Sequence, residues 1–277
     1  MFLSDLIASA GERLTPTERL LAEAVLADPT LLAFGTVSDL ASRIGTSRPS
    51  VVRFATKLGF QGYTDLQKRI REVMSGRLAR PSERIRQLEG VVEPARAAVE
   101  AAVAKAFTSL DHDRLALLAD PIARAGNVWV LSGETSQAGA RVLHSGMTMI
   151  RPGVHWIEEH SSARDLSGAA PGDTAVVFDF ARYRRHSVAA ARALAERGVA
   201  IVAITDGPLS PLAALTETWC EIEVPGIGPF DSSAPAVVVA ELLVAQVASQ
   251  LQEQARERID RTEAMWKSTQ TFHDSGD

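Results

Sequence analysis

The sequence predicts an α/β protein with two parts: an all-α N-terminal helix-turn-helix domain and a C-terminal doubly wound domain built on a five-stranded parallel sheet. Three observations lead to this fold class. The chain has 277 residues, enough for about two domains. Residues 37–56 carry two short helical patterns around a glycine-containing turn. From Gly126 onward, short β-branched runs alternate with helical patterns, which is typical of a parallel sheet covered on both faces.

The composition is that of an ordinary globular protein, but the charge is unevenly placed. The chain is 46% hydrophobic and its net charge is −5. Residues 43–80 nevertheless hold nine Lys or Arg residues against two acids, so this segment carries +7. A basic segment inside an acidic protein is typical of a module that binds nucleic-acid phosphates. A solvated helical face would have the same composition.

The single cysteine, Cys220, excludes an internal disulfide and is typical of a protein from a reducing cytoplasm. The N-terminal stretch carries Asp5 and Glu12 and lacks the basic start of a signal peptide. The richest apolar run, residues 234–245, is broken by Glu241 and is shorter than the ~18 residues that a membrane span needs. We therefore expect a cytoplasmic protein that does not contact a membrane.

The N-terminal domain is outlined by helix start signals. Thr15 and Glu18 form a capping box around Pro16, which suits a first helical turn. A short helix is expected near residues 31–34. A second capping signal at Thr36 predicts a helix that runs to Ile44.

The helix after the glycine turn has two distinct faces. Ser47 caps it, Pro49 lies in its first turn, and Gly59 ends it. A helical wheel separates an inward apolar stripe from an outward polar and basic arc. The stripe is Val51, Ala55 and Leu58, the arc is Ser50, Arg53 and Lys57, and Phe54 lies between them.

The remaining chain divides into a connecting region and a sheet domain. A further helix covers residues 63–74, and a long helical stretch spans 83–118 and ends near Asp120 and Pro121. The predicted strands are 127–131, 154–157, 174–180, 199–205 and 219–224, with helices at 136–149, 161–168, 184–197, near 211–215, and 236–258. The expected domains are 1–78 (helix-turn-helix), 79–104 (linker and connecting helix), 105–258 (sheet domain) and 259–277 (tail).

Two parts of this sequence resemble one known family. Residues 15–74 resemble the helix-turn-helix domain of RpiR-type bacterial transcription regulators, most specifically through RFATKLGFQGY at residues 53–63. Residues from about 105 to 255 are similar to the sugar isomerase (SIS) domain of these regulators, most specifically through GVAIVAITD at 198–206. The resemblance implies strand order 2-1-3-4-5, as in flavodoxin-like folds, and a homodimeric or homotetrameric regulator whose SIS domain binds a phosphosugar or a related metabolite.

A helix-turn-helix places its second helix in the major groove, so double-stranded operator DNA is the expected partner. An arginine there can bridge two acceptors of a guanine, whereas serine discriminates less. The candidate base-reading residues are Ser47, Arg48, Ser50, Arg53 and Lys57, and the candidate phosphate contacts are Thr36, Lys68 and Arg69. A helical hairpin that contacts only protein is the alternative.

The candidate effector-binding residues lie at the carboxyl ends of the predicted strands, where open α/β sheets bind ligands. After the first strand, backbone N–H groups could hold an anion at a helix N-terminus. An ordinary turn capped by Ser136 is the alternative. The candidates outside the third-strand loop are Ser132, Gly133, Glu134, Ser136, Glu159 after the second strand, and Ser232 before the last helix.

The loop after the third strand departs from the family. SIS domains that bind sugar phosphates usually carry a Ser-x-Ser-Gly-x-Thr loop there, whereas this chain has Asp179, Phe180, Ala181, Arg182, Tyr183 and Arg184. One interpretation is that Arg182, Arg184 or Arg185 binds a phosphate or carboxylate bidentately. The other is that the ligand is uncharged there and Arg182 pairs with Asp179. Asp179, Arg182, Tyr183 and Arg184 complete the candidate effector site.

The sequence as a whole predicts a transcription regulator, a repressor, controlled by a small anionic metabolite such as a phosphosugar. We expect no catalytic residue, no cofactor and no metal, since the histidines lack ligand spacing and one cysteine cannot form a paired-cysteine zinc site. Two alternatives remain: a phosphosugar isomerase or lyase fused to a DNA-binding domain, with Glu158 or Glu159 transferring the proton, and a SIS domain that serves only oligomerisation.

Overall fold

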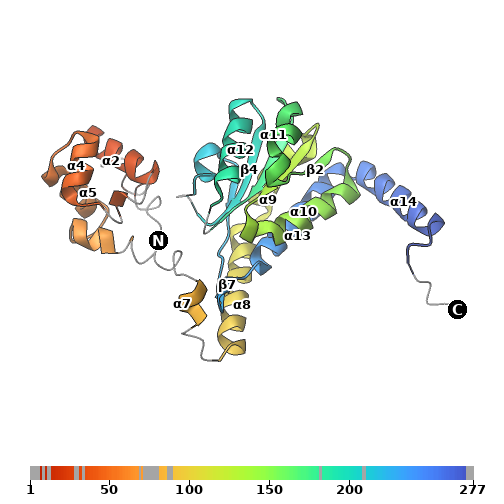
Figure 1. The fold of residues 1–277 in the computed structure, drawn as a ribbon, viewed down its shortest axis with the longest axis horizontal. Coiled ribbons are helices and arrows are strands. Elements are labelled where there is room, and N and C mark those ends of the chain that lie inside the picture. The colour runs from red at the N-terminus through yellow and green to blue at the C-terminus, as the bar shows by residue number, and fades with distance from the viewer. Residues whose placement is uncertain are drawn as a thin grey trace. The chain divides into compact units, whose positions relative to one another are not determined.

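The protein is described here by a computed structural model, which covers residues 7, 10, 14–27, 31–32, 35–68, 70, 81–85, 90–180, 183–207 and 210–272. The chain forms two compact units (Figure 1). The helical unit is Met1–Gln87 with Gly207–Ala214, and the sheet unit is Leu88–Asp206 with Leu215–Asp277.

The helical unit is built around α2 (Pro16–Ala27), α4 (Val37–Ile44) and α5 (Arg48–Lys57). The predicted inward stripe of α5 is confirmed, because Val51, Ala55 and Leu58 are all buried. Phe54 is fully buried as well, so the apolar face of α5 is wider than the wheel indicates. Residues 63–68 are helical, while the rest of the helix expected over 63–74 lies mostly outside the described residues.

Both predicted capping boxes are present in this unit. Thr36 and Asp39 exchange side-chain and backbone hydrogen bonds at the start of α4, and Thr15 and Glu18 do the same at the start of α2. The turn between α4 and α5 passes through Gly45 at φ 71°, a left-handed conformation that glycine adopts without a Cβ penalty. These local signals fix the angle at which α5 leaves α4.

The prediction of one long helical stretch over residues 83–118 is wrong. The chain forms α7 (Pro81–Ile85), α8 (Val92–Ser109) and α9 (His112–Arg124) instead. Asp111 restarts the helix, because its carboxylate accepts the Arg114 N–H at 2.8 Å. Nor does α9 end near Pro121, since the helix continues past this proline to Arg124.

The sheet unit contains a five-stranded parallel sheet in the order β2-β1-β3-β4-β5, as the resemblance implies. Val128 in β1 pairs with Val154 in β2 and with Thr174 in β3, and Thr174 pairs with Ala200 in β4. The strands are β1 (Val128–Ser132), β2 (Val154–Trp156), β3 (Thr174–Phe178), β4 (Ala200–Thr205) and β5 (Trp219–Glu221). Each lies within one to three residues of its predicted bounds.

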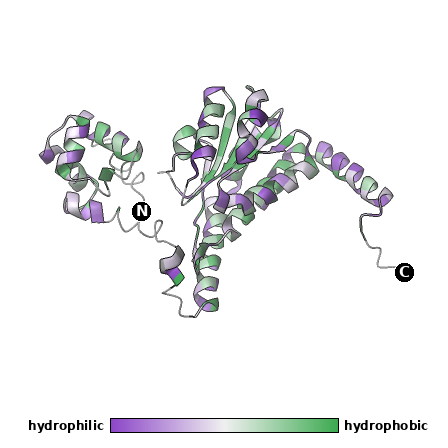
Figure 2. Ribbon diagram, viewed as in Figure 1, coloured by the Kyte–Doolittle hydropathy of each residue, from purple (hydrophilic) through white to green (hydrophobic). Residues whose placement is uncertain are grey.

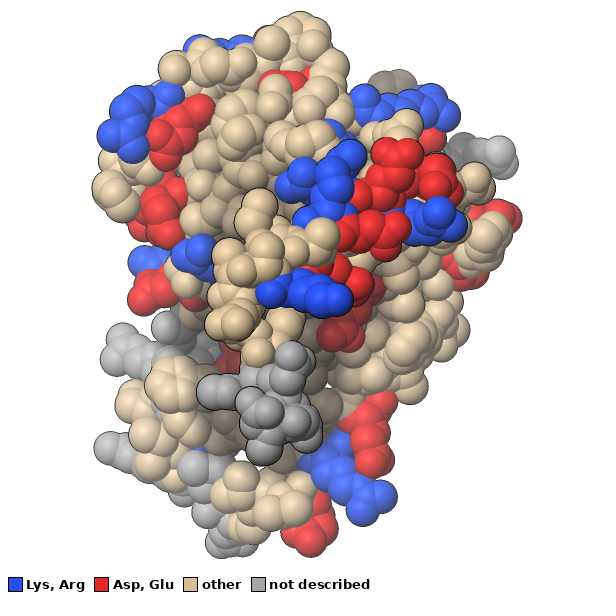
Figure 3. All heavy atoms as spheres, turned by 90° about the vertical axis from the view of Figure 1, so that its right-hand side faces the viewer, with Lys and Arg blue, Asp and Glu red and all other residues tan. Residues whose placement is uncertain are grey.

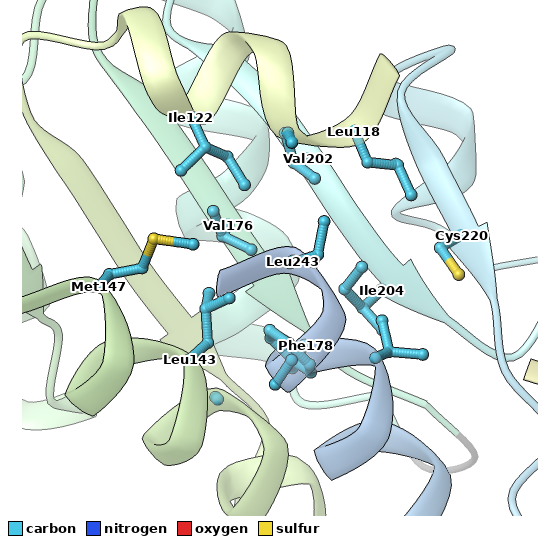
Figure 4. Close-up of a cluster of buried hydrophobic side chains, with 14 of the residues drawn as sticks. Leu118, Ile122, Leu143, Met147, Val176, Phe178, Val202, Ile204, Cys220 and Leu243 are labelled. Atoms are coloured by element: carbon cyan, nitrogen blue, oxygen red, sulfur yellow. The ribbon is translucent and has the colours of Figure 1, made fainter. Parts of the chain in front are cut away.

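Helices cover both faces of this sheet (Figure 1). One face packs against α9, α10 (Gln137–Ile150) and α13 (Ala234–Leu251), and the other carries α11 (Ser162–Asp165) and α12 (Arg185–Glu196). Figure 4 shows the larger core, where Phe178 and Ile204 from neighbouring strands meet Leu143 of α10 and Leu243 of α13. Cys220 is buried at the edge of this cluster, and burial raises the pKa of its thiol to about 12.

The final helix expected over residues 236–258 is two helices. Gln252, at φ 46°, separates α13 from α14 (Glu253–Ser268), and α14 continues well into the segment expected to be a tail. The break redirects the chain so that Ala255 is buried and Arg258 donates from Nε to the Thr148 carbonyl of α10 at 2.8 Å. A small antiparallel hairpin, β6 (Gly226–Ile227) and β7 (Phe230–Asp231), was also not predicted.

One helix in the described part of the chain, α13, is long and apolar enough to cross a membrane by length and composition. Val239, Leu243 and Val247 of this helix are nevertheless buried in the core beside the sheet. Figure 2 shows the sheet strands mostly in hydrophobic green and α14 mostly in hydrophilic purple. We therefore assign α13 as a core helix of the sheet unit.

The outer surface mixes charges of both signs. On the face drawn in Figure 3, Lys and Arg side chains lie beside Asp and Glu side chains, without forming a field of one sign. Along α14, Arg256 pairs with Glu253 at 3.2 Å and Arg261 with Glu257 at 3.8 Å. Such exposed pairs contribute little to stability.

Candidate functional site

The N-terminal half of α5 presents a connected row of polar side chains to solvent. Ser47 caps the helix by accepting the Ser50 N–H at 3.4 Å, and the two hydroxyls lie 2.9 Å apart. Arg53 donates from Nη2 to the Ser50 hydroxyl at 3.1 Å, while Arg48 is exposed at the first turn. These four predicted base-reading residues lie between the N-cap and the middle of α5, and the N-terminal part of this helix is the part that a helix-turn-helix directs at base edges.

Lys57, the fifth predicted base reader, is engaged elsewhere. Its ammonium lies 2.6 Å from the Glu18 carboxylate, which is almost fully buried and also accepts the Thr15 N–H at 2.8 Å. Burial opposes ionisation of Glu18, but hydrogen bonds from Lys57 and Thr15 outweigh it and lower the pKa of this carboxyl. The ion pair ties the last turn of α5 to the first turn of α2.

The three predicted phosphate contacts have different placements. Thr36 is exposed, but its hydroxyl donates to Asp39 Oδ2 at 2.8 Å as part of the α4 cap. Lys68 is exposed on the helix after Gly62. Arg69 lies outside the described residues.

A cavity of about 420 Å³ opens at the carboxyl edge of the sheet, where the sequence places the effector site. The segment after β1 contributes Ser132, Glu134 and Gln137 to its wall. Trp156 at the end of β2, residues 157–160 after it, and His186 of α12 line the rest. Three predicted effector residues, Ser132, Glu134 and Glu159, therefore line one cavity.

The cavity wall carries acids whose partners are close by. Glu158 accepts from Arg141 at 2.8 Å and from the Trp156 indole at 2.7 Å, and the Arg141 guanidinium lies 3.6 Å from the centre of the Trp156 ring. Glu134 pairs with Arg184. Nδ1 of His186 lies 3.3 Å from the Glu159 carboxylate. Sequence reasoning missed Gln137, Trp156 and His186, because no motif marks them; only their positions just beyond strand ends could have indicated them.

Asp179 lies buried behind this wall, at the end of β3. Its Oδ2 accepts the Arg184 N–H at 2.9 Å and a hydrogen bond from the Ser187 hydroxyl. Burial raises the pKa of Asp179 to about 6, although these hydrogen bonds act in the opposite direction. Within the described part of the chain, its Oδ1 has no hydrogen-bond partner.

The other described effector candidates are not among the residues that line the cavity. Ser136 is fully buried, and its hydroxyl donates to the Gly133 and Phe178 carbonyls at 3.1 and 2.8 Å. This hydroxyl makes no capping bond to α10. Tyr183 donates to Asp206, and Ser232 accepts the Ala234 N–H at 3.3 Å. Arg182, and with it the expected pair between Arg182 and Asp179, lies outside the described residues.

Comparison with known proteins matches both units to family models. The model described as "Helix-turn-helix domain, rpiR family" matches residues 1–76, and the model described as "SIS domain" matches residues 122–246.

Two solved structures illustrate the likeness. The sugar isomerase domain of an RpiR transcription factor from Sphaerobacter thermophilus is 24% identical, with a TM-score of 0.58 over 62% of this chain and 98% of that one. NanR of Vibrio vulnificus, solved with ManNAc-6P, is 19% identical, with a TM-score of 0.57 over 96% of this chain and 98% of that one. At these identities the likeness concerns the fold.

Proposed function

Because the chain belongs to the RpiR-type family of helix-turn-helix regulators that carry a SIS domain, we propose that it is a transcription regulator that binds DNA and responds to a small metabolite. The observation that carries this proposal is the polar row on α5, formed by Ser47, Ser50, Arg53 and the exposed Arg48. This row has the side chains that read base edges, at the helix end that enters the groove.

We assign the response to the cavity at the carboxyl edge of the sheet, with a sugar derivative as the effector. The cavity lies where open α/β sheets bind ligands, and its wall offers hydroxyl, amide, imidazole and carboxylate groups that suit a polyhydroxylated molecule. NanR, a relative in fold, was solved with a sugar phosphate. Repression that the effector relieves is the proposed mode, in a cytoplasmic homo-oligomer that binds a pseudo-palindromic operator.

Effector and DNA act on each other by linkage. If the effector prefers an arrangement of the DNA-binding units that binds DNA weakly, it lowers the affinity for DNA by the same factor by which DNA lowers the affinity for the effector. Self-association has support from large apolar side chains that are exposed in the isolated chain, such as Phe107 of α8 and Leu117 of α9, at 55% and 50% exposure.

The test of DNA reading compares two cationic side chains with different roles. A duplex is first selected from random DNA with the wild-type protein, and affinities for it and for a shuffled duplex are then measured. Arg53→Ala should lose about 1–3 kcal/mol on the selected duplex and little on the shuffled one. Lys68→Ala should weaken binding to both duplexes equally. It should also reduce the slope of log affinity against log salt concentration by the equivalent of about one phosphate contact. Equal losses from both variants on both duplexes would refute base reading by Arg53.

An isomerase or lyase activity is the second candidate. It is favoured by Glu159 and His186, whose carboxylate and Nδ1 lie 3.3 Å apart on the cavity wall and are residue types that transfer protons in isomerases. Turnover of a sugar phosphate that Glu159→Gln abolishes would establish this activity and displace the regulator as the sole function.

A further inference from the structure

Asp179 occupies the place at which a ligand's anionic group would be held. The order of strands reverses between β1 and β3, and ligands of such sheets bind between the loops that follow these two strands. The carboxylate lies between those loops: Arg184 and Ser187 at the start of α12 donate to Oδ2, and Gly133 lies against Oδ1. The N-terminus of α12 thus already holds an anion, supplied by the protein itself.

The loops after β1 and β3 pack closely around this carboxylate. A Cβ atom on Gly133 would lie 2.8 Å from Asp179 Cγ, so glycine is needed for the two loops to approach this closely. Asp179 is fully buried. A phosphate brought to the same helix N-terminus would face a like charge in a site of low dielectric, where repulsion is strong.

The cavity in front of Asp179 is acidic. Its wall includes the carboxylates of Glu134, Glu158 and Glu159, and no Lys or Arg among the described residues lines it. Two described guanidinium groups, those of Arg141 and Arg184, pair with the wall residues Glu158 and Glu134. They offset two of the wall's three carboxylates, so among the described residues Glu159 and the buried Asp179 remain as acidic groups without a guanidinium partner.

Two residues of the cavity wall, Trp156 and Glu158, already hold a cation that lies outside the lining. The Arg141 guanidinium stacks on the Trp156 ring while it donates to Glu158, which is the aromatic-plus-carboxylate pattern that recognises organic cations. Among the described residues, the charged partner of the Glu159 carboxylate is the imidazole of His186 at 3.3 Å, and the Glu159 side chain is 69% exposed. An ammonium group entering the cavity would find this carboxylate available.

We propose that the effector is a hydroxylated amine without a phosphate group, held by its ammonium at Glu159 and by its hydroxyls at Ser132, Gln137 and His186. The inference rests on the proposed function, because it names the ligand class of the same cavity. It departs from the sugar phosphate that the family resemblance implies, and the departure follows from the carboxylate that stands in the third-strand loop.

The test is calorimetric titration of the full-length protein with glucosamine, galactosamine and mannosamine, each compared with its 6-phosphate, and with inorganic phosphate. At least one amine should bind, about tenfold or more tightly than its phosphate ester, and inorganic phosphate should not bind. Glu159→Gln should lower the affinity for the amine about tenfold, because the substitution removes a charge-assisted hydrogen bond. Glu196→Gln, an exposed acid at the far end of α12, is the matched control and should bind like the wild type.

Asp179→Asn provides a second test. Because this substitution removes the negative charge of the buried carboxylate, it should reduce the difference in affinity between the amine and its phosphate ester. A phosphate ester that binds the wild type as tightly as its amine, or no binding by any of the three amines, would overturn the proposal. DNA binding measured on the same samples separates this proposal from the proposed function. A phosphate ester that shifts the affinity for DNA would overturn the amine proposal and support the regulator function. Amine binding by a protein that does not bind DNA would refute the regulator function alone.

Discussion

At the scale of single residues, buried charged groups stabilise the interior of the sheet unit. Arg151 is almost fully buried and donates to the carbonyls of Ile122, Ala125 and Gly126, so a guanidinium closes the C-terminal end of α9. Asp173 accepts from the backbone and side chain of Asn127 and from the Trp129 indole. Burial opposes ionisation of Asp173, and these hydrogen bonds outweigh it and lower the pKa of this carboxyl.

Glu18 provides the residue-scale prediction. Its folded-state pKa lies below the ordinary value of 4.5, so its contribution to stability is present above that pH and is lost as the pH falls through the folded pKa. Glu18→Gln should therefore cost about 1–3 kcal/mol at pH 7 and progressively less below pH 4.5. Denaturant titrations of both proteins at several pH values measure this difference. A difference that stays constant with pH would show that the carboxylate charge is not involved.

At the scale of elements, the backbone is strained at the junction between α13 and α14. Gln252 has φ 46° and ψ −111°, a conformation that residues with a Cβ atom rarely adopt. The strain persists because α14 is anchored beyond it, through buried Ala255 and the bond from Arg258 to Thr148.

Gln252→Gly should consequently stabilise the protein by about 1 kcal/mol, because glycine adopts positive φ without a steric penalty. Gln250→Gly, two residues earlier on the exposed face of α13, is the matched control and should destabilise it by about 1 kcal/mol. Thermal unfolding of the two variants beside the wild type compares them directly. If both variants lose stability equally, the strain at Gln252 does not exist in solution.

At the scale of the whole molecule, the two units have separate cores. Phe54 is fully buried in the helical unit, and Phe178 is fully buried in the sheet unit. Because the described core of each unit is made of its own residues, the units should unfold as separate cooperative transitions.

Calorimetry of the full-length protein should then show two transitions. Phe54→Ala should lower the midpoint temperature of the helical unit's transition alone, and Phe178→Ala that of the sheet unit's transition alone. Each substitution should cost its unit about 3–5 kcal/mol of stability. One common transition that both substitutions shift would show instead that the units are thermodynamically coupled.

The sequence alone determined the elements whose signals are local. Capping boxes at Thr15 and Thr36, the glycine turn at Gly45 and the apolar strand runs each depend on neighbouring residues, so they could be read without the fold. The strand order followed from the family resemblance. Local signals failed where distant contacts prevail: anchoring of α14 on α10 breaks the predicted final helix at Gln252.

The tertiary structure decided the chemistry of the candidate site. Lys57 counts as a base reader on a helical wheel, but the fold brings Glu18 to its ammonium from 39 residues away. Asp179 reads as one residue of an arginine-rich loop, yet the fold buries its carboxylate between Gly133 and the start of α12. The charge state, burial and partners of these side chains depend on residues that are distant in the sequence. Such residues come into contact only in the folded protein, so a local sequence pattern does not predict the contacts.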